Sequence, residues 1–218
     1  MTTAHAPDMD DHTRQLEQAL REKEAALKEL QHRAKNSLQL VISLLKLQSG
    51  RIRDPDARTA YDLTLQRIEP LAIAYRHLHE SGTETKVEFG RYLAELVTTN
   101  STNLPGGVQG TNIDVQSEKI TGGLSVAVPL GLIVNELMTN ALRHAFPAKS
   151  WIRISLSSPK PETIELVIAD NGRALPSGFD PDADAGMLLV EALAAQLNAT
   201  LTVESNGNGT TVKMVVPL

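Results

Sequence analysis

The sequence predicts an α+β protein in which a long helical hairpin precedes a mixed α/β domain. Residues 11–80 contain two stretches rich in good helix formers, whereas the rest of the chain alternates short apolar strands with helices. Gly50 and the Asp54-Pro55 pair separate the two helical stretches. Of the 218 residues, 41% are apolar and only 3% aromatic, so we expect a core of Leu, Val, Ile and Ala.

The first helix is expected over residues 11–49, where no proline interrupts the chain. The second is expected over residues 56–69 and could continue past Pro70, with a kink, as far as His79. The resulting domains are a flexible N-terminal tail (1–12), a helical hairpin (13–82) and an α/β domain (83–218).

The α/β domain is expected to contain three helices and five strands. Pro129 suits the first turn of the middle helix, and Pro147 stops it. The expected helices are 89–100, 129–146 and 184–198, and the expected strands are 113–115, 151–156, 164–169, 201–204 and 211–216.

Composition excludes several classes of protein. The chain has no cysteine, which excludes a disulfide scaffold, a thiolate zinc site and a cysteine nucleophile. A net charge of −5 argues against a nucleic-acid partner. We expect no membrane span, because no apolar run approaches the roughly 20 residues required, and we see no signal peptide. A cytoplasmic protein is therefore expected.

An apolar stripe runs along one face of the first helix. At 100° per residue, its members fall within about 40° of one line. His32 lies about 160° from that line, and Asn36 follows one turn later on the same face. The stripe consists of Leu16, Leu20, Leu27, Leu30, Ala34, Leu38, Val41 and Leu45.

Beyond His32 the same helix becomes apolar nearly all round, between Leu38 and Leu47. One antiparallel neighbour cannot bury such a helix on every side. A dimer of hairpins that forms a four-helix bundle can do so. We therefore expect a homodimer built through residues 30–75.

His32 has two interpretations that helix geometry leaves open. It is either a solvent-exposed histidine on a charged face or a nucleophilic imidazole presented to a partner. A nucleophile needs nearby positive charge to receive phosphate, and Arg33 and Lys35 supply it. Asn36 is the polar neighbour that could orient water.

The expected helix 129–146 carries an acid, an amide and two cationic side chains on one face. Glu136 and Asn140 are one turn apart, followed by Arg143 and His144. This set could hold a hydrated Mg²⁺ and a polyphosphate, since Mg²⁺ prefers a few protein oxygens together with water and phosphate. The alternative is an ordinary amphipathic helix with a solvated face.

Two later segments also suit a nucleotide. Asp170-Asn171-Gly172 follows an apolar strand, where the acid could accept a hydrogen bond from an exocyclic amine. The alternative is a simple turn, for which the same residues are typical. Gly186 lies at the start of a helix, a position that can bind phosphate, although one glycine is a weak signal.

Together and in this order, the segments resemble the sensor histidine kinases of the HRxKN class, which are related to the HWE kinases. Residues 30–39 (LQHRAKNSLQ) resemble the H-box, and residues 134–147 (VNELMTNALRHAFP) resemble the N-box. The first and second glycine boxes and the closing hairpin are similar to residues 170–172, 186–190 and 201–211.

The resemblance implies a dimerisation and phosphotransfer bundle followed by a GHKL (Bergerat-type) α/β sandwich that binds ATP and Mg²⁺. Its partner would be a response regulator with a receiver domain. The implied catalytic residues are His32 as phosphoacceptor, with Arg33, Lys35, Asn36 to position water, and Glu136 to polarise the attacking group or organise the metal shell. The implied cofactor-binding residues are Asn135, Asn140 (on Mg²⁺), Arg143 and His144 (near the phosphates), Asp170 (on adenine), Gly172, Gly186 and Thr210.

Two positions depart from the family pattern. Ala174 stands where the first glycine box has its second glycine, and Asp184 stands where the second box has its first. A carboxylate beside ATP phosphates is unfavourable, so ATP use is open. A histidine phosphotransferase or response-regulator phosphatase, and a scaffold that only binds a regulator, stay as alternatives. We also expect no PAS or GAF module before the hairpin.

Overall fold

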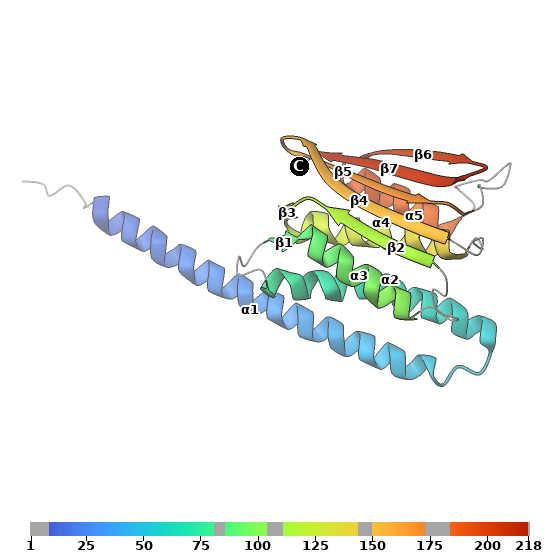
Figure 1. Ribbon diagram of the computed structural model, residues 1–218. Helices are drawn as coiled ribbons and strands as arrows, with labels where there is room; N and C mark the ends of the chain where they lie inside the picture. The colour runs from blue at the N-terminus through green and yellow to red at the C-terminus, as the bar shows by residue number, and fades with distance from the viewer. Residues whose placement is uncertain (1–8, 81–85, 104–110, 144–149, 173–183, 218) are drawn as a thin grey trace, which may run out of the picture.

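The computed structural model describes residues 9–80, 86–103, 111–143, 150–172 and 184–217. It confirms the predicted α+β architecture, with a helical hairpin followed by a mixed sheet (Figure 1). The elements are α1 (Met9–Ser49), α2 (Pro55–Glu80), β1 (Val87–Glu88), α3 (Phe89–Asn103), β2 (Thr111–Ser117), β3 (Thr121–Gly122), α4 (Leu124–Arg143), β4 (Ser150–Lys160), β5 (Thr163–Asp170), α5 (Ala185–Gln196), β6 (Thr200–Asn206) and β7 (Gly209–Pro217).

The hairpin is formed by α1 and α2. Proline at the first position of α2 suits that turn, and the Asp54 carboxylate caps it by accepting the backbone N–H groups of Asp56 and Ala57. As predicted, α2 continues through Pro70. α1 begins at Met9, within the segment 1–12 that was predicted to be a flexible tail, and the first eight residues lie outside the described part.

Side chains of α1 face α2 along one side only. Ile42 and Ser49 are buried there, and Ser49 Oγ donates to Asp62 Oδ1 at 2.5 Å. Much of the predicted apolar stripe does not face α2. Leu16, Leu20, Leu27 and Leu30 are 44–64% exposed, since the N-terminal half of α1 extends past the rest of the molecule (Figure 1).

The second half of the chain folds around a five-stranded sheet of order β2-β4-β5-β7-β6. β2 runs parallel to β4 and the other neighbours are antiparallel, while β1 and β3 form a separate two-stranded ribbon. One face of the sheet is apolar, because alternate residues of β4 and β5 point inward with the strand period of two. This face packs on α4 and α5, and the fully buried side chains include Ile152, Ile154 and Ile164.

α4 lies at the centre of the molecule, between the sheet on one side and α2 and α3 on the other (Figure 1). It begins at Leu124, not at Pro129, because Gly123 O accepts the N–H groups of Val126 and Ala127 and starts the helix earlier. Its segment Leu124–Leu142 is long and apolar enough to cross a membrane by composition, which contradicts our expectation that no segment is. That segment is 61% buried inside the protein, as suits a core helix.

Candidate functional site

The H-box residues lie on the part of α1 that runs beside the end of α2. His32 and Asn36 are both exposed, one helical turn apart. Arg33 forms an ion pair with Glu29 on its own helix, and Lys35 is half-buried. The face therefore offers an accessible imidazole with cationic and amide side chains next to it, as a phosphoacceptor requires.

α4 brings Glu136 into contact with the hairpin. Arg67 of α2 donates from Nε to Glu136 Oε1 at 2.9 Å and from Nη2 to Oε2 at 2.8 Å. The Glu136 side chain is 6% exposed and that of Arg67 37%. Glu136 thus does not lie on a solvated helix face, and both of its oxygens are used by a bidentate ion pair.

The start of α5 meets the same carboxylate. A Cβ placed on Gly186 would lie 3.0 Å from both Glu136 Oε2 and Asp184 Oδ1, and 3.5 Å from Asn140 Nδ2. A side chain here would be in tight contact with these groups, which would have to move by a few tenths of an ångström. Glu136, Asn140, Asp184 and Gly186 therefore form one cluster, which we call the α4–α5 cluster.

Asp184 has a local structural role in this cluster. It is the N-cap of α5, and its Oδ1 accepts the N–H groups of Gly186 (2.8 Å) and Met187 (2.9 Å). These are the backbone donors that a phosphate would otherwise use at a helix start. The departure from glycine at this position consequently places a carboxylate at the predicted phosphate site.

The electrostatics of the cluster act on Arg67. Its hydrogen bonds with Glu136 raise the pKa of the guanidinium, burial opposes this change, and the charges of Glu136 and Asp184 add to it. Arg67 is therefore a cation paired with Glu136 and stabilised further by the charge of Asp184. Sequence reasoning missed this residue, because nothing in the local pattern of α2 distinguishes Arg67 from a surface arginine.

The predicted adenine site lies at the ends of β5 and β7. Asp170 and Thr210 are opposite each other in the antiparallel pair, and Asp170 Oδ1 accepts the N–H of Gly172 at 2.7 Å. Gly209 has a φ of +131°, and a Cβ there would lie 1.9 Å from Asp170 O. The close approach of the β6–β7 turn thus fixes the backbone at Asp170 and Asn171.

The remaining predicted site residues are not all in this region. Asn135 is buried and accepts a hydrogen bond from Asn100 of α3 at 2.5 Å, so its amide is directed to α3 and not to the α4–α5 cluster. Arg143 ends α4, but its side chain lies outside the described part, as do His144 and Ala174.

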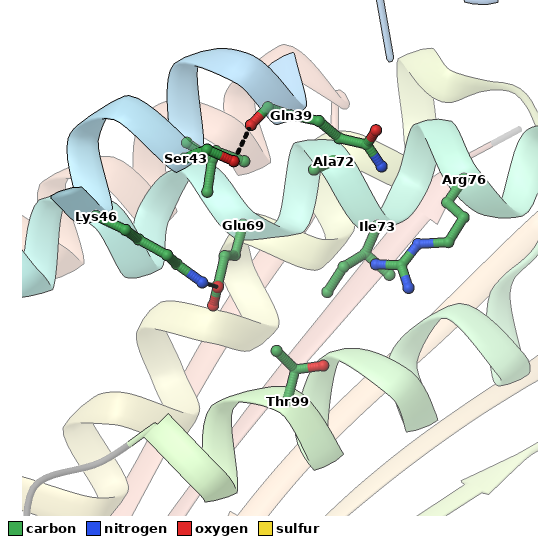
Figure 2. A pocket seen from close by; sticks show the side chains of 9 residues that line it. Gln39, Ser43, Lys46, Glu69, Ala72, Ile73, Arg76 and Thr99 are labelled. Atoms are coloured by element: carbon green, nitrogen blue, oxygen red, sulfur yellow. Dashed lines mark hydrogen bonds and ion pairs between the residues drawn. The ribbon is translucent and has the colours of Figure 1, made fainter. Parts of the chain in front are cut away.

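A cavity of about 390 Å³ lies where α1, α2 and α3 meet (Figure 2). Helix periodicity places its α1 residues Gln39 and Ser43 on the same face as His32, two and three turns further along. Lys46 Nζ and Glu69 Oε1 form an ion pair across it at 2.5 Å. The lining residues are Gln39, Ile42, Ser43, Lys46, Glu69, Ala72, Ile73, Arg76 and Thr99.

The donor set of the α4–α5 cluster fits a magnesium nucleotide in part. Glu136, Asp184 and the Asn140 amide supply the oxygen ligands that Mg²⁺ prefers. In the conformation described here, however, Arg67 uses both Glu136 oxygens and backbone N–H groups use Asp184 Oδ1. Among the described residues no group of three or more His, Cys, Asp or Glu could hold a metal alone.

Comparison with known proteins assigns both halves of the chain. Residues 29–103 match the family model described as histidine kinase, and residues 125–218 match that of the histidine kinase-, DNA gyrase B- and HSP90-like ATPases. The first region contains His32, and the second contains the α4–α5 cluster and Asp170. The predicted resemblance is therefore confirmed.

Two relatives of this chain are also named as histidine kinases. A blue-light-activated histidine kinase 2 of Erythrobacter litoralis is 29% identical over 88% of this chain and 57% of its own length. Sensor histidine kinase PdtaS of Mycolicibacterium smegmatis is 29% identical over 93% of this chain and 41% of its own length. The chain thus spans only about half of the curated relatives it matches.

A solved structure supports the arrangement of the whole chain. The histidine kinase domain of a blue-light activated histidine kinase of E. litoralis is 28% identical and covers 90% of this chain and 95% of its own, with a TM-score of 0.66. The likeness extends across both the hairpin and the sheet domain. The chain thus combines a helical hairpin of the histidine kinase type with a GHKL-type ATPase domain.

Proposed function

We propose that this histidine kinase transfers the γ-phosphoryl group of ATP to His32 and then to an aspartate of a receiver domain. The observation that carries the proposal is the pair of sites on one chain: an exposed imidazole on α1 and the α4–α5 cluster in the ATPase domain. In the transfer, a ring nitrogen of His32 forms a bond to phosphorus as the bond to the ADP oxygen breaks.

The roles that we propose for the side chains are those that the family resemblance implies. Asn140 would hold Mg²⁺, and Glu136, once freed from Arg67, would polarise the imidazole or organise the metal shell. Asp170 would accept a hydrogen bond from the adenine amine. Mg²⁺·ATP would supply the phosphoryl group and neutralise its charge. Arg33 and Lys35 would offset the negative charge gained at His32.

Asn36 would act in a separate reaction, the hydrolysis of the phosphorylated receiver aspartate by water, which releases inorganic phosphate. Its amide is exposed one turn from His32, where it could orient water toward a phosphorylated receiver aspartate. The cavity on the same face of α1 lies beside this surface. A receiver domain that docks along this face would reach both residues.

Labelling with γ-labelled ATP and Mg²⁺ tests the proposal. The chain should gain acid-labile label, and His32→Ala should abolish it. His12→Ala is the matched control, because His12 is an exposed histidine on the same helix and should leave labelling unchanged. Labelling that survives in His32→Ala would contradict the proposal.

A second function is favoured by one observation, the Asp184 carboxylate at the start of α5. Negative charge there opposes phosphate binding and favours a phosphotransferase or phosphatase that does not use ATP. In that case ATP gives no label, whereas a phosphorylated receiver labels His32 or loses its phosphate in an Asn36-dependent way.

We also propose that the chain works as a homodimer through residues 30–75. α1 has large apolar side chains on the side that α2 does not cover, and they are 46–64% exposed. A second hairpin would bury this stripe, which consists of Leu30, Leu40, Val41, Leu44 and Leu47. The cytoplasmic location stays a prediction.

A further inference from the structure

The Arg67–Glu136 pair joins the hairpin to the ATPase domain at the centre of the candidate site. It is bidentate, at 2.9 and 2.8 Å, and buries the Glu136 side chain to 6% exposure. A carboxylate held in this way has a fixed orientation, and each of its oxygens already accepts a hydrogen bond from a cation. While the pair is closed, a metal or an attacking imidazole has to compete with Arg67 for the Glu136 oxygens.

The guanidinium also supplies the charge that the cluster needs. Glu136 and Asp184 both act electrostatically on Arg67, and both approach Gly186 closely. Two carboxylates this near one another are unfavourable without a cation between or beside them. Arg67 and Mg²⁺ would meet the same requirement, so they compete for it.

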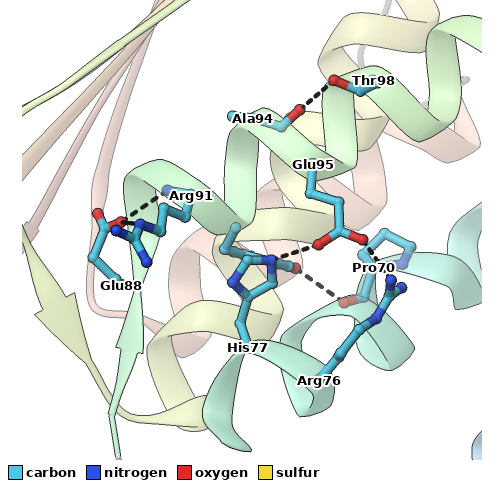
Figure 3. Close-up of polar contacts among 9 residues, drawn as sticks. Pro70, Arg76, His77, Glu88, Arg91, Ala94, Glu95 and Thr98 are labelled. Carbon is cyan, nitrogen blue, oxygen red and sulfur yellow. Dashed lines mark hydrogen bonds and ion pairs between the residues drawn. The ribbon is translucent and has the colours of Figure 1, made fainter. Parts of the chain in front are cut away.

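Other contacts of α2 hold the ATPase domain in the same position (Figure 3). Tyr92 Oη donates to Pro70 O at 3.1 Å, and burial raises the pKa of this phenol. Glu95 of α3 accepts from Arg76 at 2.6 Å and lies 2.6 Å from His77 Nε2. The docked arrangement is thus fixed along successive turns of α2, with Arg67 as the contact that reaches the site.

In this arrangement His32 is far from the cluster along the hairpin. Lys46 pairs with Glu69, which places that part of α1 beside the turn of α2 that carries Arg67. His32 precedes Lys46 by a length of helix that spans about 21 Å at 1.5 Å per residue. Transfer to His32 of the same subunit needs the ATPase domain to leave this position.

We propose that Arg67 is an intramolecular latch, which neutralises Glu136 and Asp184 in the docked conformation and must release Glu136 before that carboxylate can serve Mg²⁺·ATP. The second half of this statement rests on the proposed kinase function, whereas the first half concerns the nucleotide-free chain alone. Release frees the ATPase domain and exposes the cluster in one step.

A distance measurement on the nucleotide-free full chain tests the latch. The chain has no cysteine, so Arg53→Cys and Thr202→Cys provide two exposed attachment points for spin labels, one in the hairpin turn and one on β6. Doubly labelled chain is diluted with unlabelled chain, so that pulsed EPR reports distances within one subunit. We expect a single narrow distribution for the parent.

Arg67→Gln should add a second, undocked distance, with an undocked fraction about tenfold higher, as loss of a charged hydrogen-bond pair implies. Arg58→Gln is the matched control: it removes an arginine from the same helix, where the Asp62 pair is exposed and 3.9 Å long. Arg67→Glu should also undock, and Arg67→Glu with Glu136→Arg should restore the narrow distribution. An unchanged distribution in Arg67→Gln would overturn the latch.

Binding of Mg²⁺ with a non-hydrolysable ATP analogue separates the two proposals. The latch predicts that Arg67→Gln binds the analogue about tenfold more tightly than the parent. Weaker binding would mean that Arg67 positions Glu136 for the nucleotide, and it would overturn the latch. If neither protein binds the analogue while Arg67→Gln still undocks, the latch stands and ATP-dependent kinase activity fails.

Discussion

The hairpin and the ATPase domain differ in how completely their apolar side chains are buried within one chain. The ATPase domain has side chains with no exposed surface on every layer, among them Phe89, Tyr92 and Ile154. On α1, by contrast, only Ile42 is a buried apolar residue among those described. Eight of the eleven large apolar side chains that the described residues expose lie on α1. The ATPase domain is complete within one subunit, whereas the hairpin needs another surface.

The largest effect is expected from substitutions on the exposed apolar side of α1, which we propose contacts the second hairpin. Leu40→Gln with Leu44→Gln replaces two side chains that are 61% and 51% exposed in the single chain. Burial of a leucine contributes about 1.5–3 kcal/mol, and a symmetric dimer would lose four of them. We expect the dimer dissociation constant to rise at least about 1000-fold, measured by analytical ultracentrifugation.

Leu188→Gln is the control for this experiment. Leu188 is 45% exposed on α5, away from the hairpin, so its loss should leave the dissociation constant unchanged. A parent chain that is monomeric at all accessible concentrations would contradict the homodimer. Equal weakening by Leu188→Gln would place the contact on the ATPase domain instead.

The next largest effect is on the free energy of unfolding, which one core substitution in the ATPase domain and one substitution on α1 should change to different extents. Ile154→Ala opens a cavity in the core of the ATPase domain and should lower the free energy of unfolding by about 2–5 kcal/mol. Leu20→Ala, where the side chain is 58% exposed, should change it by less than about 0.5 kcal/mol. Urea unfolding followed by fluorescence of Trp151, the only tryptophan, reports on the sheet in both cases.

If Leu20→Ala lowered the midpoint of this transition as much as Ile154→Ala, the two regions would unfold as one unit. The sheet core would then depend for its stability on the N-terminal half of α1, in contrast to the difference in burial between the two regions.

A smaller effect concerns the turn that abuts the predicted adenine site. Gly209→Ala forces a side chain into a positive φ and against the carbonyl of Asp170, so it should cost about 1–3 kcal/mol of stability. Gly207→Ala is its control two residues away, because a Cβ there meets nothing within 4 Å. Nucleotide affinity should fall only in Gly209→Ala, and equal effects of both substitutions would refute this explanation.

Local pattern predicted those parts of the fold whose residues contact near neighbours in sequence. The period of two in β4 and β5, and the long proline-free stretch of α1, were sufficient to identify these elements. The ribbon of β1 and β3 was missed, because each strand has only two residues and is defined by its partner. The start of α4 was placed at Pro129 because Pro129 suits a first turn, whereas Gly123 O begins the helix earlier.

Site residues were harder to predict than elements, since their partners come from distant parts of the chain. The pattern placed Glu136 and Asn140 together, but it did not indicate that Arg67 would form an ion pair with Glu136. The family resemblance implied that Asn135 binds the nucleotide, whereas in the structure that amide accepts a hydrogen bond from Asn100. Both contacts depend on how α2 and α3 pack on α4, which no single segment encodes.

The smallest stability effect is expected at the one carboxylate that departs from the glycine pattern. Asp184→Gly removes the cap of α5, and replacing an N-cap aspartate by glycine costs only a few tenths of a kcal/mol. It also removes negative charge from the start of α5 and frees the N–H groups of Gly186 and Met187. Affinity for Mg²⁺·ATP, measured by calorimetry, should therefore rise about two- to fivefold.

Asp54→Gly makes the same chemical change at the cap of α2, far from the α4–α5 cluster. It should cost similar stability and leave nucleotide affinity unchanged, so the pair of variants separates loss of a cap from removal of charge at the site. Weaker nucleotide binding in Asp184→Gly than in Asp54→Gly would show that the carboxylate assists the ligand. In that case Asp184 would belong to the metal shell with Asn140, and its departure from glycine would be a gain of function and not a defect.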